Sequence, residues 1–217
     1  APRAQHPADT VAEVELSSAR SVRRLGLCEQ NGRTMATRTI PILPGYDVIA
    51  RLGSGAGSAI SLARDAARGS FVAIKHIVRN GPEDDKFIAQ AENEYEVTRG
   101  FVHPNLRQCY ELLRVRRWLK TRELVLIMEY VDGDRLEDER PDGIEALLAV
   151  FMRVAEGLHA LHQHGYVHAD IKPHNILLAK DGGVKLIDFG QSCPLGHVKE
   201  RVQGTPDYIA PEQVRRL

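Results

Sequence analysis

Short apolar runs separated by turn-forming residues follow one another from residue 46 onward. We interpret them as strands of an antiparallel sheet, at Tyr46 to Leu52, Ala59 to Asp65, Phe71 to Val78 and Leu124 to Tyr130. The tetrapeptide Ala67-Arg68-Gly69-Ser70 predicts a hairpin turn between the second and third of these strands. The charged segment 84–100 predicts a helix that interrupts the strands, because Gly100 ends it and Pro104 follows shortly.

A second, longer helix is predicted after Asp142, which we expect to be its N-cap, and Gly165 lies beyond its end. Its apolar residues recur at helical spacing and predict a buried stripe made of Ile144, Leu147, Leu148, Phe151, Val154, Ala155, Leu158 and Leu161. Two short strands are predicted next, at Asn175 to Leu178 and Val184 to Leu186, joined by the turn Asp181-Gly182-Gly183. The expected fold class is therefore α+β.

Residues 1–44 contain no Phe, Tyr or Trp and only one short apolar alternation, Val11 to Leu16, so we expect a poorly ordered leader. They lack the continuous apolar stretch of a secretory signal. Because the segment from Met35 runs straight into the first strand, we hypothesise that the natural start is Met35 and that residues 1–34 are upstream translation. N-terminal sequencing of the natively expressed protein tests this hypothesis.

Composition excludes several classes of protein. The 217 residues include 29 Lys plus Arg and 29 Asp plus Glu, so the net charge is zero and no affinity for nucleic acid is expected. The longest apolar run, Leu124 to Met128, is far shorter than the roughly 20 residues of a membrane helix, so no membrane segment is expected. Three cysteines, Cys28, Cys109 and Cys193, give no disulfide framework, and we expect a cytoplasmic protein.

A glycine-rich loop, Gly53-Ser54-Gly55-Ala56-Gly57-Ser58, lies between two predicted strands. The dinucleotide-binding interpretation needs such a loop between a strand and a helix, so it is disfavoured. A hairpin that covers phosphates fits better, because glycines let the backbone N–H groups approach an anion closely. Taken alone, such a loop is more often a plain turn.

Four further motifs follow in order along the chain: Val72-Ala73-Ile74-Lys75, Asp170-Ile171-Lys172-Pro173-His174-Asn175, Asp188-Phe189-Gly190, and Gly204-Thr205-Pro206-Asp207-Tyr208-Ile209-Ala210-Pro211-Glu212. With this order and spacing, the chain from about residue 45 resembles eukaryotic-like (Hanks-type) Ser/Thr protein kinases, and bacterial members look closest. The resemblance implies a two-lobed fold. Residues 45–131 would form a small antiparallel-sheet N-lobe with the hinge, and residues 132–217 a partial, mainly helical C-lobe.

The resemblance implies five catalytic residues, which are Lys75, Glu94, Asp170, Lys172 and Thr205. Lys75 would hold the α- and β-phosphates of ATP and pair with Glu94. Asp170 would accept the proton of the substrate hydroxyl, Lys172 would steady the γ-phosphate, and Thr205 would bond near both. Without the family, each would be read as a solvated surface charge.

Glu94 is selected by family spacing from the motif His103-Pro104-Asn105, while Glu92 and Glu96 lie on other faces of the same helix. Asn175 and Asp188 would supply oxygen ligands to Mg²⁺, which prefers carboxylate, amide and phosphate oxygens.

The remaining nucleotide contacts are expected in the glycine loop and around the adenine, from Gly53, Ser54, Gly55, Gly57, Ser58, Ile60, Ala73, Met128, Glu129, Val131 and Leu177. Met128 aligns with the gatekeeper, and the main chain of Glu129 and Val131 would pair with adenine. Ile60, Ala73 and Leu177 would sandwich the base. Without the family, these are simply core positions.

A zinc site is disfavoured, although His159, His162, His164, His168 and His174 fall in one short stretch. No cysteine or carboxylate completes a convincing set of ligands with them.

Four positions depart from the family pattern, and two of them, Ala169 and Arg201, bear on regulation. Ala169 stands where many members have an Arg that pairs with a phosphorylated residue, and Arg201 stands at the usual phosphorylation site. We therefore hypothesise that activity does not depend on phosphorylation within this segment. Gly57 stands where an aromatic loop tip is frequent, and Ser58 replaces the third loop glycine.

The chain ends five residues after Glu212, where the family continues with several helices, so we expect a fragment of a kinase. The expected reaction of the parent protein is ATP-dependent phosphorylation of Ser and Thr on a protein substrate. The alternatives are a catalytically inactive nucleotide-binding pseudokinase and a small-molecule phosphotransferase of the same fold. The second is disfavoured because it would lack the motif from Gly204 to Glu212.

Overall fold

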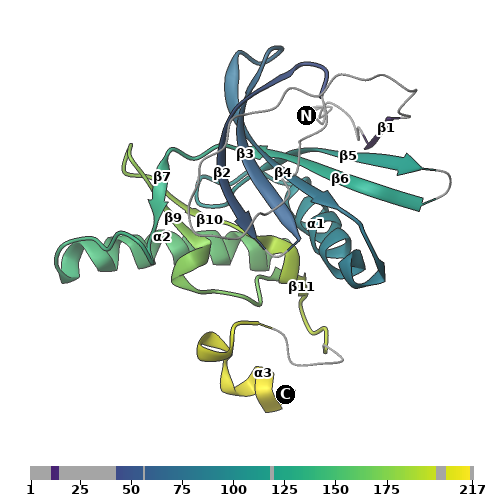
Figure 1. Ribbon diagram of the computed structural model, residues 1–217. Helices are drawn as coiled ribbons and strands as arrows, with labels where there is room; N and C mark the ends of the chain where they lie inside the picture. The colour runs from purple at the N-terminus through teal and green to yellow at the C-terminus, as the bar shows by residue number, and fades with distance from the viewer. Residues whose placement is uncertain (1–10, 15–42, 56, 118–119, 199–203, 216–217) are drawn as a thin grey trace, which may run out of the picture.

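The computed structural model describes residues 11–14, 43–55, 57–117, 120–198 and 204–215. Its longer strands and helices are β1 Val11–Val14, β2 Tyr46–Gly55, β3 Ser58–Asp65, β4 Ser70–Val78, α1 Asp85–Thr98, β5 Cys109–Arg117, β6 Lys120–Glu129, β7 Gly133–Arg135, α2 Ile144–Gln163, β9 Ile176–Ala179 and β10 Val184–Leu186. The two-residue strands β8 Tyr166–Val167 and β11 Cys193–Pro194 and the short helix α3 Pro211–Arg215 complete the described strands and α-helices. Figure 1 shows two parts, one dominated by a sheet and one by α2.

The upper part is a six-stranded sheet in the order β1-β5-β6-β4-β3-β2. Its pairs are antiparallel except β1 with β5, which are parallel. The predicted hairpin between β3 and β4 is confirmed. Asp65 Oδ1 accepts the N–H groups of Ala67 and Arg68, and Gly69 has φ +67°, a conformation that favours glycine.

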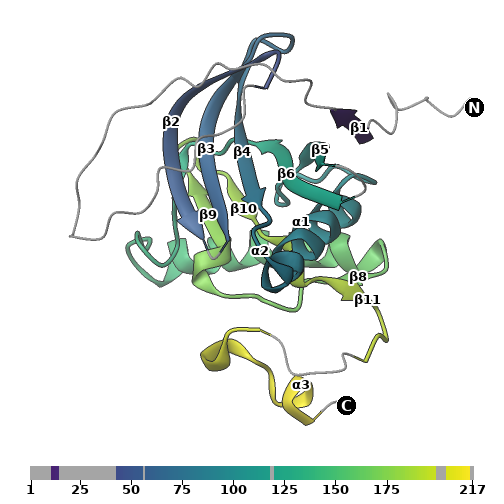
Figure 2. The ribbon, with the colours of Figure 1, turned by 45° about the vertical axis from the view of Figure 1, so that its right-hand side comes forward.

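Helix α1 packs on one face of this sheet, beside β4 to β6 (Figure 2). Its buried residues Ile88, Ala91 and Tyr95 join one core cluster with Ile77, Leu112, Leu124, Leu126 and Met128 of the sheet. A second cluster covers the opposite face, with Leu43, Val72, Ile74, Val125 and Ile127. Each fully buried aliphatic side chain here contributes about 1.5–3 kcal/mol, so α1 and the sheet form one rigid support.

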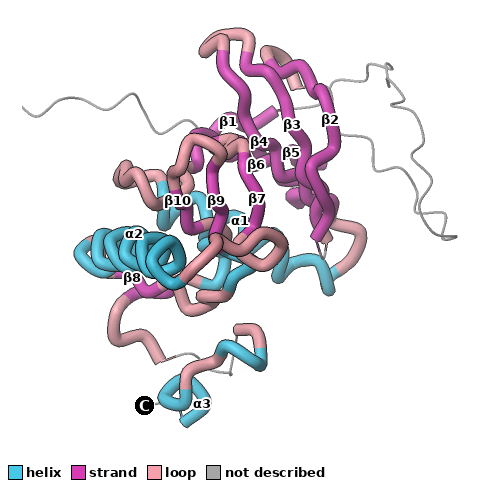
Figure 3. The backbone as a smooth tube through the Cα atoms, turned by 90° about the vertical axis from the view of Figure 1, so that its left-hand side faces the viewer, coloured by secondary structure: helices cyan, strands magenta, loops and turns pink. Residues whose placement is uncertain are grey.

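The lower part places α2 against the three-stranded sheet β10-β9-β7 (Figure 3). Gly157 of α2 lies so close to Asn105 and Leu106 that an added Cβ would be 3.2 Å from both residues. The predicted stripe of α2 is only partly right, because Ile144, Leu148 and Phe151 are 46% to 67% exposed. The apolar positions span a wider arc than the narrow sheet covers, and Val150, Val154, Ala160 and Leu161 are the buried side chains.

Three local predictions need correction. The N-cap of α2 is Gly143 rather than Asp142, because the chain enters the helix at φ +84°, which favours glycine. Strand β5 is not among the predicted strands, because its charged residues interrupt the apolar pattern that marks the others. The predicted strand at Asn175 begins one residue later, since Asn175 ends a 3₁₀ turn.

The expected leader also differs from the structure at its described residues. Val11–Val14 form β1 and pair with Leu112 to Val115, so these four residues extend the sheet rather than lie in a poorly ordered segment. Leu43 is 7% exposed and belongs to the sheet core, so the folded region includes a residue before 45. The hypothesis about Met35 lies outside the described residues. None of the described helices combines the length and apolar character that crossing a bilayer requires.

Candidate active site

A cavity of about 290 Å³ lies where the two parts of the molecule meet. Six of the residues predicted to contact nucleotide line it: Gly53, Ile60, Ala73, Glu129, Val131 and Leu177. They come from β2, β3, β4, the end of β6, the segment after β6, and β9. The structure therefore brings together the two walls that the sequence placed more than 40 residues apart, with a slot of suitable shape between them.

Four other predicted nucleotide residues belong to the glycine loop but do not line this cavity: Ser54, Gly55, Gly57 and Ser58. Gly53, Ser54 and Gly55 pair with Ile60, Ala59 and Ser58, so β2 and β3 form a hairpin, and its pair Gly53 and Ile60 lines the slot. Gly57 has φ +77°, and a Cβ added there would overlap the ring of Phe87 on α1. An aromatic side chain therefore does lie against the loop, but it comes from α1 rather than from the loop itself.

Met128, a further predicted nucleotide residue, directly precedes Glu129 on β6. Met128 is fully buried in the core cluster and pairs with Ala73, so it lies behind the cavity wall. The Glu129 N–H already donates to Gln108 O at 2.9 Å, so an adenine contact at Glu129 would use its carbonyl oxygen. The Glu129 carboxylate is held by Lys185 Nζ at 2.6 Å, which fixes the hinge to β10.

Lys75 and Glu94 form the expected ion pair between the sheet and α1. Lys75 Nζ lies 2.7 Å from Glu94 Oε2 and 3.8 Å from Asp188 Oδ1. Burial alone would raise the pKa of Glu94, but the charges of Lys75 and Arg107 outweigh it and lower this pKa to about 2. The anionic form of Glu94 is therefore favoured at neutral pH. The choice of Glu94 over Glu92 and Glu96 agrees with the geometry, because those two side chains pair with Arg114 and Arg99.

Arg107 is a site residue that the sequence prediction missed. Its Nη2 lies 2.8 Å from Glu94 Oε1, and the residue is 7% exposed. It also lines the nucleotide cavity, beside Ala73 and Ile187. The signal in the sequence was weak, because a single cation after the apolar Leu106 forms no motif.

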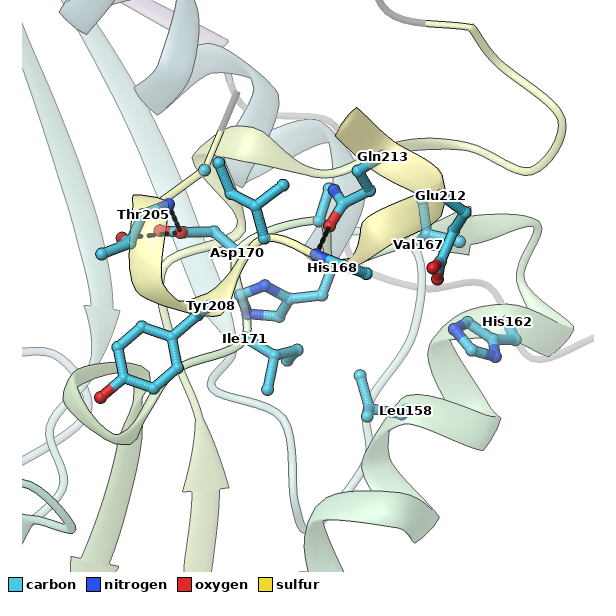
Figure 4. Close-up of a pocket in the computed structure, with 14 residues that line it drawn as sticks. Leu158, His162, Val167, His168, Asp170, Ile171, Thr205, Tyr208, Glu212 and Gln213 are labelled. Carbon is cyan, nitrogen blue, oxygen red and sulfur yellow. Dashed lines mark hydrogen bonds between the residues drawn. The ribbon is translucent and has the colours of Figure 1, made fainter. Parts of the chain in front are cut away.

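The other predicted catalytic residues, Lys172 and Thr205, lie around Asp170, and Figure 4 shows Thr205 beside it. Lys172 Nζ lies 3.0 Å from Asp170 Oδ2 and 2.7 Å from Thr205 Oγ1. Thr205 donates to Asp170 Oδ1 through its N–H at 3.2 Å and its hydroxyl at 3.1 Å. Burial raises the pKa of Asp170, but the hydrogen bond and charge of Lys172, with help from Thr205 and Asn175, lower it below its ordinary value.

A second cavity, of about 360 Å³, lies beside this cluster between α2 and residues 204–213. Leu158 and His162 project toward it from α2, and Tyr208 and Gln213 line it from the terminal segment (Figure 4). Asp170 and Thr205 border it as well, so the carboxylate lies at the edge of an open space.

Asn175 and Asp188 fit a magnesium ion. Asn175 Nδ2 donates to Asp170 O at 2.8 Å, while the buried Asn175 Oδ1 has no hydrogen-bond partner in the described structure. The Asp188 side chain is 45% exposed, so its oxygens remain accessible. An amide oxygen and a carboxylate match the preference of Mg²⁺ for hard oxygen ligands. Among the described residues, no cluster of three His, Cys, Asp or Glu side chains could hold a metal without further ligands.

Two residues without glycine's freedom adopt positive φ at this site, Ala169 at +62° and Asp188 at +65°. They directly precede Asp170 and Phe189. Such conformations cost about 1–3 kcal/mol and persist where surrounding contacts fix them, which is common at functional sites. Asn93 on α1 supplies such contacts, because its Nδ2 donates to the carbonyl oxygens of Phe189, Gly190 and Ser192 at 2.8–3.2 Å.

His168 has a structural place next to the catalytic loop. It is 1% exposed, its ring lies 5.0 Å from that of Phe189, and Nε2 lies 3.1 Å from Ile187 O. Burial lowers its pKa, so the neutral ring is favoured. The described cysteines, Cys109 and Cys193, are buried free thiols, and burial raises the pKa of Cys109 to about 12.

Comparison with known proteins gives a consistent result. The family described as protein kinase domain matches residues 46–217. The chain is 31% identical over 175 residues to serine/threonine-protein kinase 36 of Pongo abelii, a match that covers 78% of this chain and 13% of that protein. It is 30% identical over 176 residues to CBL-interacting protein kinase 9 of Oryza sativa subsp. japonica, covering 77% of this chain and 38% of that protein.

A third relative is myosin light chain kinase 3 of Homo sapiens, 32% identical over 194 residues, with 84% of this chain and 23% of that protein covered. The chain thus matches only a minor part of the length of these relatives. The matched region contains the ion pair of Lys75 with Glu94 and the cluster around Asp170. This chain belongs to the protein kinase family, whose members use ATP.

Proposed function

We propose that the protein transfers the γ-phosphoryl group of ATP, with Mg²⁺, to serine and threonine hydroxyls of a protein substrate. The observation that carries this proposal is the cluster in which Lys172 and Thr205 both bond Asp170 while Asn175 Oδ1 remains unpartnered. Lysine two residues after the catalytic Asp is the pattern of Ser/Thr kinases in the family that this chain resembles. The name of its relative serine/threonine-protein kinase 36 also supports the Ser/Thr class.

Each residue has a physical role in this reaction. Lys75 lies between Glu94 and Asp188, so its ammonium faces the phosphates from a position fixed by α1. Asp170 is the anionic base that accepts the proton of the attacking hydroxyl. Lys172 neutralises charge that develops on the transferred group, because positioned cations are worth most in a water-poor site.

Asn175 and Asp188 would hold the metal ion. When bound, Mg²⁺ neutralises charge on the phosphate oxygens. The protein's own contribution is to orient the two oxygen ligands, since Asn175 Nδ2 is bonded to Asp170 and Asp188 follows strand β10.

The test is transfer of labelled phosphate from [γ-³²P]ATP to a generic protein substrate by this chain and by its Asp170→Asn variant. We expect transfer that Asp170→Asn abolishes. Absence of transfer by the unmodified chain, with retained ATP binding, would support the pseudokinase alternative. Amino-acid analysis of the product distinguishes phosphoserine and phosphothreonine from phosphotyrosine.

A cytoplasmic location is also proposed. It is supported by the buried free thiols Cys109 and Cys193, which suit a reducing compartment. The test is alkylation of the protein isolated from its natural source. The reaction is run under denaturing conditions, and the reactive thiols at Cys109 and Cys193 are counted.

A further inference from the structure

The carboxylate of Glu94 is shared between two buried cations. Its Oε2 lies 2.7 Å from Lys75 Nζ and its Oε1 lies 2.8 Å from Arg107 Nη2. The Glu94 side chain has no exposed surface, and the Arg107 side chain is 8% exposed. Ion pairs of this kind stabilise only when both partners stay in place, because a buried charge that loses its partner is strongly destabilising.

Arg107 is also tied to the lower part of the molecule through its main chain. Its N–H donates to Leu186 O at 2.9 Å, and Leu106 bridges to Leu186 as well. Leu186 ends β10, two residues before Asp188. Arg107 therefore links α1 to the strand that leads into Asp188. Its guanidinium pairs with Glu94 of α1, and its main-chain N–H is bonded to the strand.

The charge balance explains why a second cation is useful. Lys75 and Arg107 face Glu94, and Asp188 lies 3.8 Å from Lys75, so two cations face two carboxylates. In the proposed reaction, Lys75 binds the phosphates while it stays paired with Glu94, so its charge is shared between them. Arg107 gives the buried Glu94 carboxylate a second cationic partner, which holds it in place when phosphates share the charge of Lys75.

We propose that Arg107 is a positioning residue that holds Glu94, and with it α1, against the strand leading to Asp188, so that Glu94 keeps Lys75 in position to bind the nucleotide phosphates. The part concerning the nucleotide rests on the proposed function, and the part concerning Glu94 does not. Arg107 does not act on the reacting atoms. It acts through Glu94 and Lys75.

A thermal-stability cycle tests the shared carboxylate without any activity measurement. The variants Lys75→Met and Arg107→Met each leave Glu94 one cation, so we expect each to lower the melting temperature by a few degrees. Together they leave Glu94 unpaired, and we expect a loss of about 10 °C, more than the sum of the single effects. Additive losses would overturn the proposal.

The effect of Glu94→Gln on the melting temperature should change sign between two backgrounds. Loss of packing volume alone cannot produce such a change. In the wild type the substitution removes the anion between two cations, so the melting temperature falls. In the Lys75→Met, Arg107→Met double variant it removes an unpaired buried charge, so the melting temperature rises. If the double variant does not fold, recovery of folding in the triple variant is the same result. A fall in both backgrounds contradicts the proposal.

Arg114→Met is the matched control. Arg114 Nε also pairs with a glutamate of α1, Glu92 Oε1 at 2.9 Å, but this pair is partly exposed. We expect almost no change in melting temperature, because exposed pairs contribute little. A loss equal to that of Arg107→Met would show that any arginine contact to α1 suffices.

The kinetic arm separates positioning from general stability. With Arg107→Met we expect the KM for ATP to rise about tenfold with a smaller change in kcat, since Glu94 then holds Lys75 less firmly at the phosphates. Arg107→Lys, which keeps the charge, should recover most of the loss. An unchanged KM with a reduced kcat overturns the claim that Arg107 keeps Lys75 in position to bind ATP. Absence of transfer in every version refutes the proposed function but leaves the stability cycle interpretable.

Discussion

Thr205 donates two hydrogen bonds to one carboxylate oxygen of Asp170, from its N–H at 3.2 Å and its hydroxyl at 3.1 Å. The residues are 35 positions apart in the chain. Lys172 Nζ completes a triangle, at 2.7 Å from the Thr205 hydroxyl oxygen and 3.0 Å from Asp170. These hydrogen bonds attach the segment that begins at Gly204 to the loop that carries Asp170 and Lys172.

Thr205→Val should lower kcat about tenfold while it leaves the KM for ATP nearly unchanged. Valine keeps the shape and the main-chain hydrogen bond but loses the hydroxyl, and a hydrogen bond to a charged group contributes about 1.5–3 kcal/mol. Steady-state kinetics of phosphate transfer measure this. Thr205→Ser, which retains the hydroxyl, should stay within about twofold of the wild type, and a loss as large as that of valine would contradict the role of the hydroxyl.

Asn175→Ala should raise the Mg²⁺ concentration needed for half-maximal transfer by at least about tenfold, because the unpartnered Oδ1 is removed. A magnesium titration at saturating ATP measures the shift. Asn105→Ala is the control, because Asn105 is equally buried but its Nδ2 donates to Val184 O at 3.0 Å. It should reduce stability and leave the magnesium requirement unchanged.

Stability should fall steeply in acid because of Glu94. The pKa of Glu94 is about 2 in the folded protein and 4.5 ordinarily, so protonation of this carboxyl favours the unfolded state. The stabilisation is fully present above pH 4.5 and is lost as the pH falls toward 2, with a total of about 3 kcal/mol. Chemical denaturation between pH 6 and pH 3 measures the slope, and Glu94→Gln should flatten it. An unchanged slope would mean that other carboxyls dominate.

Gly57→Ala should destabilise the protein more than Gly69→Ala does. Both glycines have positive φ, at +77° and +67°, so both substitutions carry the backbone penalty of about 1–2 kcal/mol. Only at Gly57 does the new Cβ overlap Phe87, whereas nothing lies within 4 Å at Gly69. Denaturant titration should therefore show that Phe87→Ala reduces the cost of Gly57→Ala but not that of Gly69→Ala.

Phosphatase treatment of the active protein should leave its activity unchanged. Ser192 is 6% exposed and its hydroxyl donates to His168 O at 3.3 Å, so it is covered in the folded protein. The position of Arg201 lies outside the described residues. Quantitative transfer assays before and after treatment test this, and a loss of activity would restore a role for phosphorylation.

Asn93→Ala should lower activity, because Asn93 makes three hydrogen bonds that hold residues 189–192. Gln90→Ala, on the preceding turn of α1, is the control that leaves these bonds intact. An Asn93 variant with full activity would show that the segment is held by other contacts.

Local sequence patterns were sufficient for the parts of the fold with strong periodicity. The strands β2, β3, β4 and β10 and helix α1 match their predictions closely, since alternation and turn residues act over a few positions. The burial of α2 could not be predicted in the same way. Its apolar residues cover a wide arc, and only the narrow sheet β10-β9-β7 decides which of them are covered.

The sequence by itself determined which residue types carry the chemistry, because Lys75, Asp170, Asn175 and Asp188 stand in ordered motifs whose spacing is specific. Tertiary structure decided how they are held. Arg107, Asn93 and Phe87 belong to no motif, and each acts across a contact between elements distant in the chain. A buried charge acquires its partner only when the chain has folded, so the second cation on Glu94 emerges from packing rather than from any local pattern.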